Sequence, residues 1–351
     1  MTSLGSQDIW NHLDSLTKPA RSLGRLEELA ARLCEVQQTL FPRTTPRRIV
    51  LFAGDHGVAG SGVSAWPSEV TRLMVKNIRA GGAASTVLAR QTQTDAMLID
   101  VGVLGDVCAD EGQAPAERPG IRFRRRRIRA GTRDLALEPA LLLGEFEAAI
   151  HVGRDEAREA ASDGMRVVAA GEMGIGNTTP SACLAMLLAD VPLGEAVGRG
   201  AGADDAVLDR KRQVVELAVG RVRRRWAREP LAAVAAVAGL EIAAMAGFYA
   251  EAHAAGLTIV LDGYVAGAAA LIAELLTPGA ARSMIASHLS AEPGHRFVLD
   301  RLRLRPFLHW NLRLGEGTGA LLLMPLLDAA AAMTTQMARL QDLGISRKIE
   351  P

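Results

Sequence analysis

The sequence predicts an α/β fold in which a parallel, Rossmann-like β-sheet is flanked by helices. Short apolar runs alternate with helical stretches, and the runs lie in the segments 48–57, 96–103, 166–180, 257–271 and 283–295. Their apolar character is continuous, which is typical of strands that are buried on both faces. Strands that alternate with helices in this way form parallel sheets.

Polar and glycine-rich residues follow each of the clearest strands. Examples are GDHG at 54–57, GEMGIGNTT at 171–179 and SHLSAEPGH at 287–295. In open parallel sheets, ligands bind at the carboxyl ends of the strands. We therefore expect these loops to converge on a substrate site at that edge.

The two ends of the chain differ from its middle, because they carry helical spacing and little strand signal. The stretch 22–40 has apolar residues at helical intervals, as does the stretch after residue 317, where Pro325 predicts a bend. We expect residues 1–30 and 317–351 to form a small helical domain, and 31–316 to form the large α/β domain. The polar, Pro- and Gly-rich segment 105–120 is expected to be a loop.

Composition limits the classes of function. The 351 residues include 40 basic and 39 acidic ones, which gives a net charge of +1. A general nucleic-acid binder needs a positive field that this chain lacks. The basic runs 122–129 and 221–225 are interpreted as solvated faces or contacts at the rim of a phosphate site.

The cysteines and the apolar pattern indicate a cytoplasmic protein. Cys34, Cys108 and Cys183 are far apart and odd in number, so a disulfide framework is not expected. The N-terminal residues lack a signal-peptide pattern, and no uninterrupted apolar run reaches the roughly 18 residues of a membrane span. We therefore expect a soluble enzyme or binder without a membrane partner.

The loop Gly171–Pro180 is the strongest local feature. Three glycines, two threonines and an asparagine stand between a strand and a helix that Pro180 is expected to open. Such a loop can direct several N–H groups and hydroxyls at a phosphate. It contains neither the GK[ST] of a Walker loop nor a complete GxGxxG. It therefore predicts a phosphate or anion site rather than a dinucleotide site.

Three further features could belong to the same site. The glycine-rich stretch 198–205 precedes Lys211, which could supply a point charge to a phosphate or could be an exposed helix lysine. Asp262 ends a strand and could hold ribose hydroxyls. The polar residues of 287–295 resemble a binding loop, although each could instead satisfy backbone groups.

Two motifs near the first strand have structural alternatives. Asp55 and His56 could be an acid/base pair or metal ligands, but we favour a turn held by side-chain hydrogen bonds. No convincing set of metal ligands can be assembled, so we expect neither a metal nor another cofactor. Trp66 could stack on a flat ring or anchor a loop, and Ser68 is expected to precede a helix.

Glu316 lies in RLGEGTGALLL, the segment 313–323. Its side chain could simply stand at the start of a helix, could lie beside a phosphate-binding loop, or could serve as a base that accepts a proton. The positive end of the following helix favours its charged form and lowers its pKa, whereas an apolar pocket raises the pKa. We expect burial to outweigh the helix when substrate is bound.

Taken together, these motifs resemble the nicotinate-nucleotide–dimethylbenzimidazole phosphoribosyltransferase family. The resemblance covers nearly the whole chain in order, through the segments 16–30, 52–71, 171–182, 261–271, 287–295 and 313–325. It implies transfer of phosphoribose from nicotinate mononucleotide to 5,6-dimethylbenzimidazole, which yields α-ribazole 5′-phosphate and nicotinate in cobalamin nucleotide-loop assembly. It also implies a homodimer.

The resemblance assigns roles to residues of this chain. It implies that Glu316 is the catalytic base. It places phosphate and ribose contacts at Glu172, Gly174, Asn177, Thr178, Gly200, Gly202, Lys211 and Ser290. It places the base pocket at Ser64, Trp66, Met173 and Leu314, although the family usually has Phe or Tyr where Trp66 stands.

Other functions remain as alternatives. A non-catalytic azole or nucleotide binder of the same fold would bind both substrates without releasing nicotinate. A Rossmann dehydrogenase would carry an early GxGxxG, but the first strand ends in GDHG. A phosphoribosyltransferase that uses phosphoribosyl pyrophosphate and magnesium would carry a paired-acid signature, which this sequence lacks.

Overall fold

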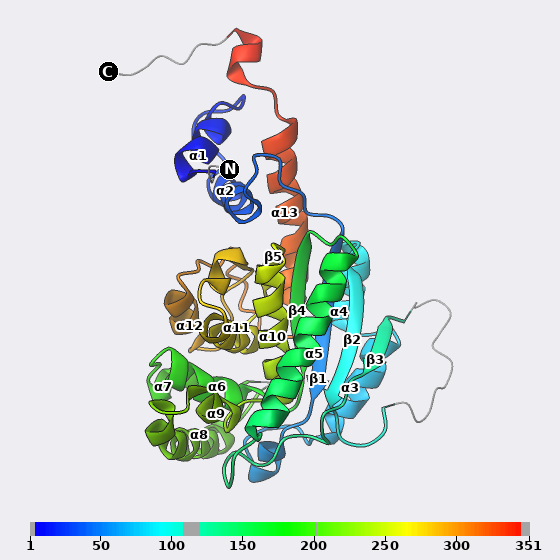
Figure 1. Cartoon of the computed structure of the whole chain (residues 1–351), viewed down its shortest axis with the longest axis vertical. Coiled ribbons are helices and arrows are strands. Elements are labelled where there is room, and N and C mark those ends of the chain that lie inside the picture. The colour runs from blue at the N-terminus through cyan, green and yellow to red at the C-terminus, as the bar shows by residue number, and fades with distance from the viewer. Residues whose placement is uncertain (1–3, 108–119, 201, 345–351) are drawn as a thin grey trace.

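The computed structural model describes residues 4–107, 120–200 and 202–344 (Figure 1). Cys108 and most of the predicted loop 105–120 lie outside the described residues. Six parallel strands form one sheet: β1 (Arg47–Gly54), β2 (Asp95–Gly102), β3 (Arg122–Arg125), β4 (Val167–Met173), β5 (Thr258–Leu261) and β6 (Met284–Ala286). The predicted α/β class and the parallel sheet are therefore confirmed.

The strand order decides where a ligand can enter. The order is β3-β2-β1-β4-β5-β6, which is the order of dinucleotide-binding Rossmann domains. The connections on the two sides of β1 and β4 run in opposite directions, so their carboxyl ends flank a crevice. The sequence alone did not determine this order.

One face of the sheet is covered by the middle of the chain. Its helices are α5 (Leu143–Ser162), α6 (Thr178–Leu188), α7 (Leu193–Ala196), α8 (Asp205–Trp226), α9 (Pro230–Ala235), α10 (Leu240–Ala254), α11 (Tyr264–Leu276) and α12 (His295–Leu302). Val50 and Phe52 of β1 face this core, whereas Ile49 and Leu51 face the other one. Alternate residues of a strand point to opposite faces, so both sets are apolar.

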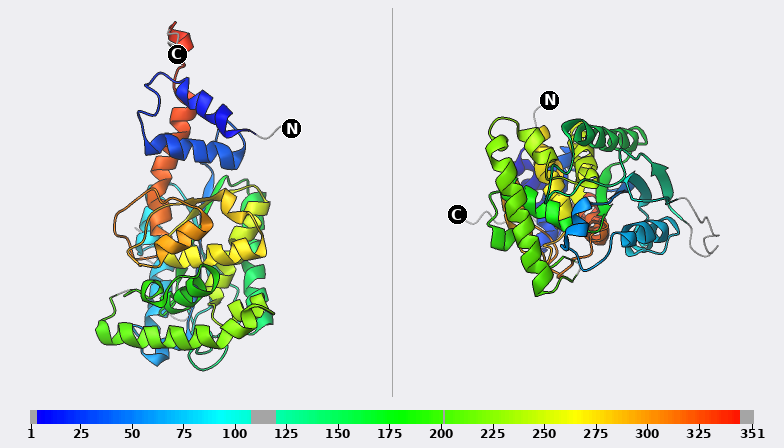
Figure 2. Two further views of the ribbon diagram at one scale, coloured as in Figure 1. Left: turned by 90° about the vertical axis from the view of Figure 1, so that its left-hand side faces the viewer. Right: turned by 90° about the horizontal axis from the view of Figure 1, so that it is seen from below.

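The opposite face is covered by both ends of the chain. Its helices are α1 (Ser6–Asp14), α2 (Arg25–Gln37), α3 (Glu69–Arg79), α4 (Ala84–Gln91) and α13 (Thr318–Gln336), and the chain also has the short 3-10 helices η1 (Gly57–Ser61), η2 (Ala280–Ser283) and η3 (Leu340–Leu343). The helical termini are thus confirmed. Figure 2 shows α1 and α2 at one end of the molecule and α8 across the other.

The predicted division into two domains stays a prediction. Its first boundary, residue 30, falls inside α2, and the apolar core that contains Leu33 and Leu327 also contains Ile49 of the sheet. The helix α13 continues through Pro325. Ser68 does precede a helix, as expected.

The structure corrects two details. The run 122–129 is not simply a solvated face, because its first half forms the edge strand β3, where Arg124 pairs with Glu156 and Glu159. The arginines of this run replace the apolar residues by which the sequence predicts a strand. The helix after the phosphate loop begins at Thr178, so Pro180 lies in its first turn but does not open it.

Among the described residues, α13 is long and apolar enough to cross a membrane by length and composition. However, 61% of its most apolar window is buried inside the protein. This burial is typical of a core helix, and α13 packs against α2 and the sheet.

Candidate active site

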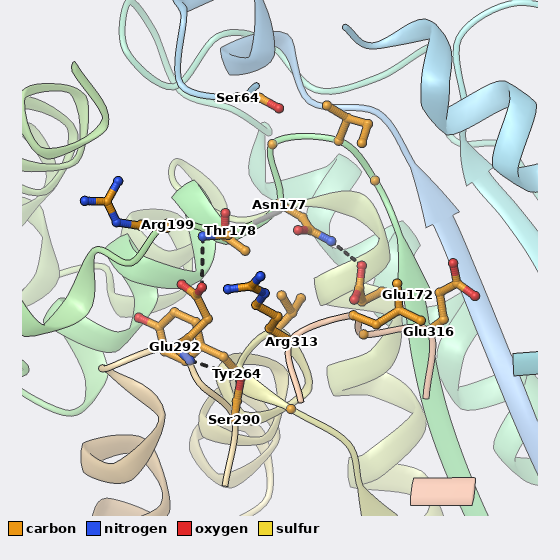
Figure 3. A pocket seen from close by; sticks show the side chains of 18 of the residues that line it. Ser64, Glu172, Asn177, Thr178, Arg199, Tyr264, Ser290, Glu292, Arg313 and Glu316 are labelled. Carbon is orange, nitrogen blue, oxygen red and sulfur yellow. Dashed lines mark hydrogen bonds between the residues drawn. The ribbon is translucent and has the colours of Figure 1, made fainter. Parts of the chain in front are cut away.

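A pocket opens at the carboxyl edge of the sheet (Figure 3). Its walls are the loops that follow β1, β4, β5 and β6, together with the turn before α13 and one residue of α8. The structure brings together most of the predicted site residues: Ser64, Glu172, Met173, Gly174, Asn177, Thr178, Gly200, Lys211, Asp262, Ser290, Leu314 and Glu316.

Two predicted residues do not line this pocket. Trp66 is 51% exposed, and its backbone N–H bonds back to Ser64 Oγ at 3.1 Å. Gly202 is exposed and adopts a φ of 106° outside the lining. Their proposed contacts with the base and with the ribose phosphate stay predictions.

One end of the pocket is built to receive an anion. The turn from Gly174 to Asn177 leads into α6, so the N-terminus of this helix, which favours an anion, lies at the pocket lining. Lys211 is buried, and its Nζ donates to Thr178 Oγ1 at 2.8 Å and to the Gly198 carbonyl at 3.1 Å. Burial lowers the pKa of Lys211 to about 8. Lys211 therefore lines the pocket and is not an exposed helix lysine.

Five further residues that line the pocket had no individual role predicted from the sequence: Arg199, Tyr264, His288, Glu292 and Arg313. Glu292 Oε1 accepts the Gly200 N–H at 2.9 Å, whereas its Oε2 is buried without a hydrogen-bond partner. In the view of Figure 3, Arg313 lies between Glu292 on one side and Glu172 on the other. All of these residues lie in or beside motifs already noted, but residue type alone did not show which would face inward.

The other end of the pocket collects buried acids. Glu172, Asp262 and Glu316 are 7%, 3% and 4% exposed. Burial, with the nearby carboxylates of Glu241, Asp262 and Glu316, raises the pKa of Glu172 well above its usual range. The amide of Asn177 donates to Glu172 and opposes this rise. The two ends therefore differ in charge.

Glu316 sits on a strained turn. Gly315, Glu316 and Gly317 have φ values of 83°, 57° and 71°, which place a glutamate in the left-handed region that favours glycine. A Cβ on Gly171 of β4 would lie 2.5 Å from the Glu316 carbonyl carbon, so the turn passes directly over the strand. Strain of this kind persists only where surrounding contacts fix the backbone.

Asp262 supplies the fixing contacts. Its Oδ2 accepts the Gly317 N–H at 3.1 Å and its Oδ1 accepts the Gly319 N–H at 2.7 Å. Both carboxylate oxygens thus hold the start of α13. The predicted contact of Asp262 with ribose hydroxyls stays a prediction, and it would have to share these oxygens.

The carboxylate of Glu316 reaches a different helix from the one that follows it. Ser85, in the first turn of α4, donates its hydroxyl to Glu316 Oε2 at 3.0 Å. Burial is the largest influence on Glu316 and raises its pKa above the ordinary value, while the hydrogen bonds from Ser85 oppose the rise. This direction agrees with the expectation that burial prevails.

The GDHG motif lies behind the pocket. Asp55 Oδ2 accepts the Leu104 N–H at 2.7 Å, and His56 Nε2 bonds Glu241 Oε1 at 2.7 Å with both side chains fully buried. A Cβ on Gly174 would meet the His56 ring, so the pair packs under the phosphate loop. Asp55 thus binds a backbone N–H, but that N–H belongs to the loop after β2, and His56 pairs with a side chain, so the turn-holding interpretation is met only in part. Within the described ranges, no three His, Cys, Asp or Glu side chains group as metal ligands.

With this geometry, comparisons with known proteins are informative. The family model described as phosphoribosyltransferase matches residues 5–345. A nicotinate-nucleotide–dimethylbenzimidazole phosphoribosyltransferase of Thermus thermophilus is 45% identical over 335 residues, which is 95% of this chain and 96% of that protein. The chain belongs to this phosphoribosyltransferase family.

A second relative and a solved structure of the same family are also similar to this chain. The Pseudomonas putida protein of the same name is 42% identical over 94% of this chain and 91% of its own length. The crystal structure of CobT from Thermus thermophilus matches with a TM-score of 0.89 and 44% identity, over 98% of this chain and 99% of that one. The protein is thus a phosphoribosyltransferase, and its family functions in cobalamin biosynthesis.

Proposed function

We propose that the enzyme transfers phosphoribose from nicotinate mononucleotide to 5,6-dimethylbenzimidazole or a related base, with Glu316 as the general base. The products are α-ribazole 5′-phosphate and nicotinate. The observation that carries the proposal is that one pocket contains both a buried lysine, Lys211, which bonds Thr178 at the start of α6, and a buried carboxylate, Glu316. The name of the similar Thermus thermophilus protein supplies the two reactants of this proposal, a nicotinate nucleotide and dimethylbenzimidazole.

The chemistry needs few groups. One nitrogen of the azole attacks the sugar carbon C1′, and the bond from C1′ to the nicotinate nitrogen breaks, so that its electron pair leaves with a neutral pyridine ring. Glu316 accepts the proton from the second azole nitrogen. Attack on the face opposite the leaving group converts the β-linkage into an α-linkage. One carboxylate within hydrogen-bond reach is sufficient for this proton transfer.

The other residues of the pocket would position the two substrates. The first turn of α6 and Lys211 would hold the 5′-phosphate, and Arg199 and Arg313 add positive charge around the anionic mononucleotide. Met173, Leu314 and Ser64 would contact the flat base beside Glu316. Holding both reactants in attack geometry removes much of the entropic barrier.

The direct test is incubation with nicotinate mononucleotide and a panel of benzimidazoles, purines and phenols, with nicotinate release followed for each. We expect release that depends on an azole acceptor. Binding of both compounds without nicotinate release would instead support a non-catalytic binder of this fold. Light scattering in the same preparation tests the homodimer that the resemblance implies.

A further inference from the structure

Ser85 is far from the proposed base in sequence but touches it in the fold. It is 1% exposed, lies in the first turn of α4, and donates its hydroxyl across 231 positions of the chain to Glu316 Oε2. Nothing in the sequence around Ser85 pointed to a site. Because both partners are buried, water cannot easily replace this hydrogen bond.

The hydroxyl of the next residue, Thr86, makes a different kind of hydrogen bond. Thr86 is also fully buried, but its Oγ1 donates to the Ala83 carbonyl at 2.8 Å, within its own helix turn. Ser85 instead points away from its helix, toward Glu316. The two adjacent buried hydroxyls therefore have different partners, and a substitution of Thr86 can serve as a control for a substitution of Ser85.

The surroundings of Glu316 otherwise favour its neutral form. Burial raises the pKa of Glu316, and the Asp262 carboxylate adds to this rise. The other titratable groups that line the pocket near it are Glu172, His288 and Arg313. The side chain and the main chain of Ser85 lower the pKa of Glu316, and the N-terminal end of α4 also favours a negative charge.

We propose that Ser85 is a positioning residue for the reaction: its hydroxyl orients the Glu316 carboxylate and stabilises its ionised form, so that the carboxylate can accept the azole proton. This inference rests on the proposed function for the role of Glu316. The contact itself does not depend on that role, so the two can be tested separately.

The first experiment measures Glu316 directly in the substrate-free enzyme. Glutamate carboxyls are labelled with ¹³C and titrated by NMR, and the Glu316 signal is identified by its loss in Glu316→Gln. In Ser85→Ala we expect the pKa of Glu316 to rise by about one pH unit, because a hydrogen bond to a charged group is lost. Ser85→Thr keeps the hydroxyl and should restore the wild-type value.

Thr86→Val is the matched control, since it removes a buried hydroxyl one residue away without touching Glu316. It should leave the pKa of Glu316 unchanged. An unchanged Glu316 titration in folded Ser85→Ala would overturn the inference. Should Ser85→Ala fail to fold, Ser85→Cys makes the same comparison with a weaker donor of similar size.

The second experiment links the contact to catalysis. In Ser85→Ala the acid limb of kcat against pH should move to higher pH by the same amount, with the KM for nicotinate mononucleotide unchanged. In a Glu316→Gln background, Ser85→Ala should have no further effect on kcat. Full activity of Glu316→Gln would refute the proposed base, whereas an unmoved acid limb with an inactive Glu316→Gln would refute only the role of Ser85.

Discussion

Lys211 and the start of α6 meet at one end of the pocket, whereas Glu172, Asp262 and Glu316 meet at the other. At the first end, hydrogen bonds within the protein already fix the cation, and the N-terminus of α6 favours an anion. At the second, three buried carboxylates share a small volume, and the pKa of Glu172 and that of Glu316 are raised.

The difference separates two tasks of the proposed reaction, binding of the phosphate of nicotinate mononucleotide and removal of the proton of the azole. A fixed cation at a helix N-terminus would hold the phosphate in the ground state and the transition state alike, so we expect it to act mainly through KM. A carboxylate with a raised pKa is useful only when a proton moves, so it acts through kcat. Changes at the two ends should therefore have separable kinetic effects.

The largest effect is expected at the acid end. Glu316→Gln keeps the shape of the side chain but removes the proton acceptor, so kcat should fall at least ~100-fold, the lower range for loss of a general base. The KM for nicotinate mononucleotide should change little, as measured by nicotinate release over a range of substrate concentrations. Glu216→Gln, at an exposed position of α8, is the control. Near-normal turnover in Glu316→Gln would show that another group takes the proton.

The next effect is expected at the cationic end. Lys211→Met keeps most of the buried volume but removes the charge, and the loss of a charge-assisted bond to phosphate should raise the KM for nicotinate mononucleotide about tenfold or more. The decrease in kcat should be smaller than the rise in KM. Arg212→Met removes the next cation along α8, which pairs with Asp209 at the surface, and should leave the KM unchanged. Equal KM values in the two variants would argue against phosphate binding by Lys211.

The smallest effect is expected from pH alone. Burial lowers the pKa of Lys211 to about 8, so this lysine loses its charge as the pH rises through that value. The KM for nicotinate mononucleotide should therefore be higher above about pH 8 than near pH 7. The substrate phosphate, with a second pKa of about 6, does not titrate in this range. Lys211→Met should abolish the alkaline rise, and a rise that persists in that variant would have to come from another group.

Much of the fold could be predicted from the sequence, since five strands, the terminal helices and the ligand edge follow from apolar periodicity. The strand β3 could not, because the arginines of 122–125 replace the apolar pattern at the sheet edge with ion pairs to α5. Most predicted site residues line the pocket, since they lie in loops that leave the same edge. Trp66 and Gly202 do not, although each belongs to such a loop.

The sequence by itself determined the α/β class and the positions of the glycine-rich loops, because periodicity and glycine-rich turns are local properties. The role predicted for Glu316 came from the resemblance to the family. Only the tertiary structure decided the strand order, the left-handed turn held by Asp262, and the contact of Ser85 with Glu316. Such contacts join residues far apart in the chain. Their strength comes from burial, which no local pattern specifies.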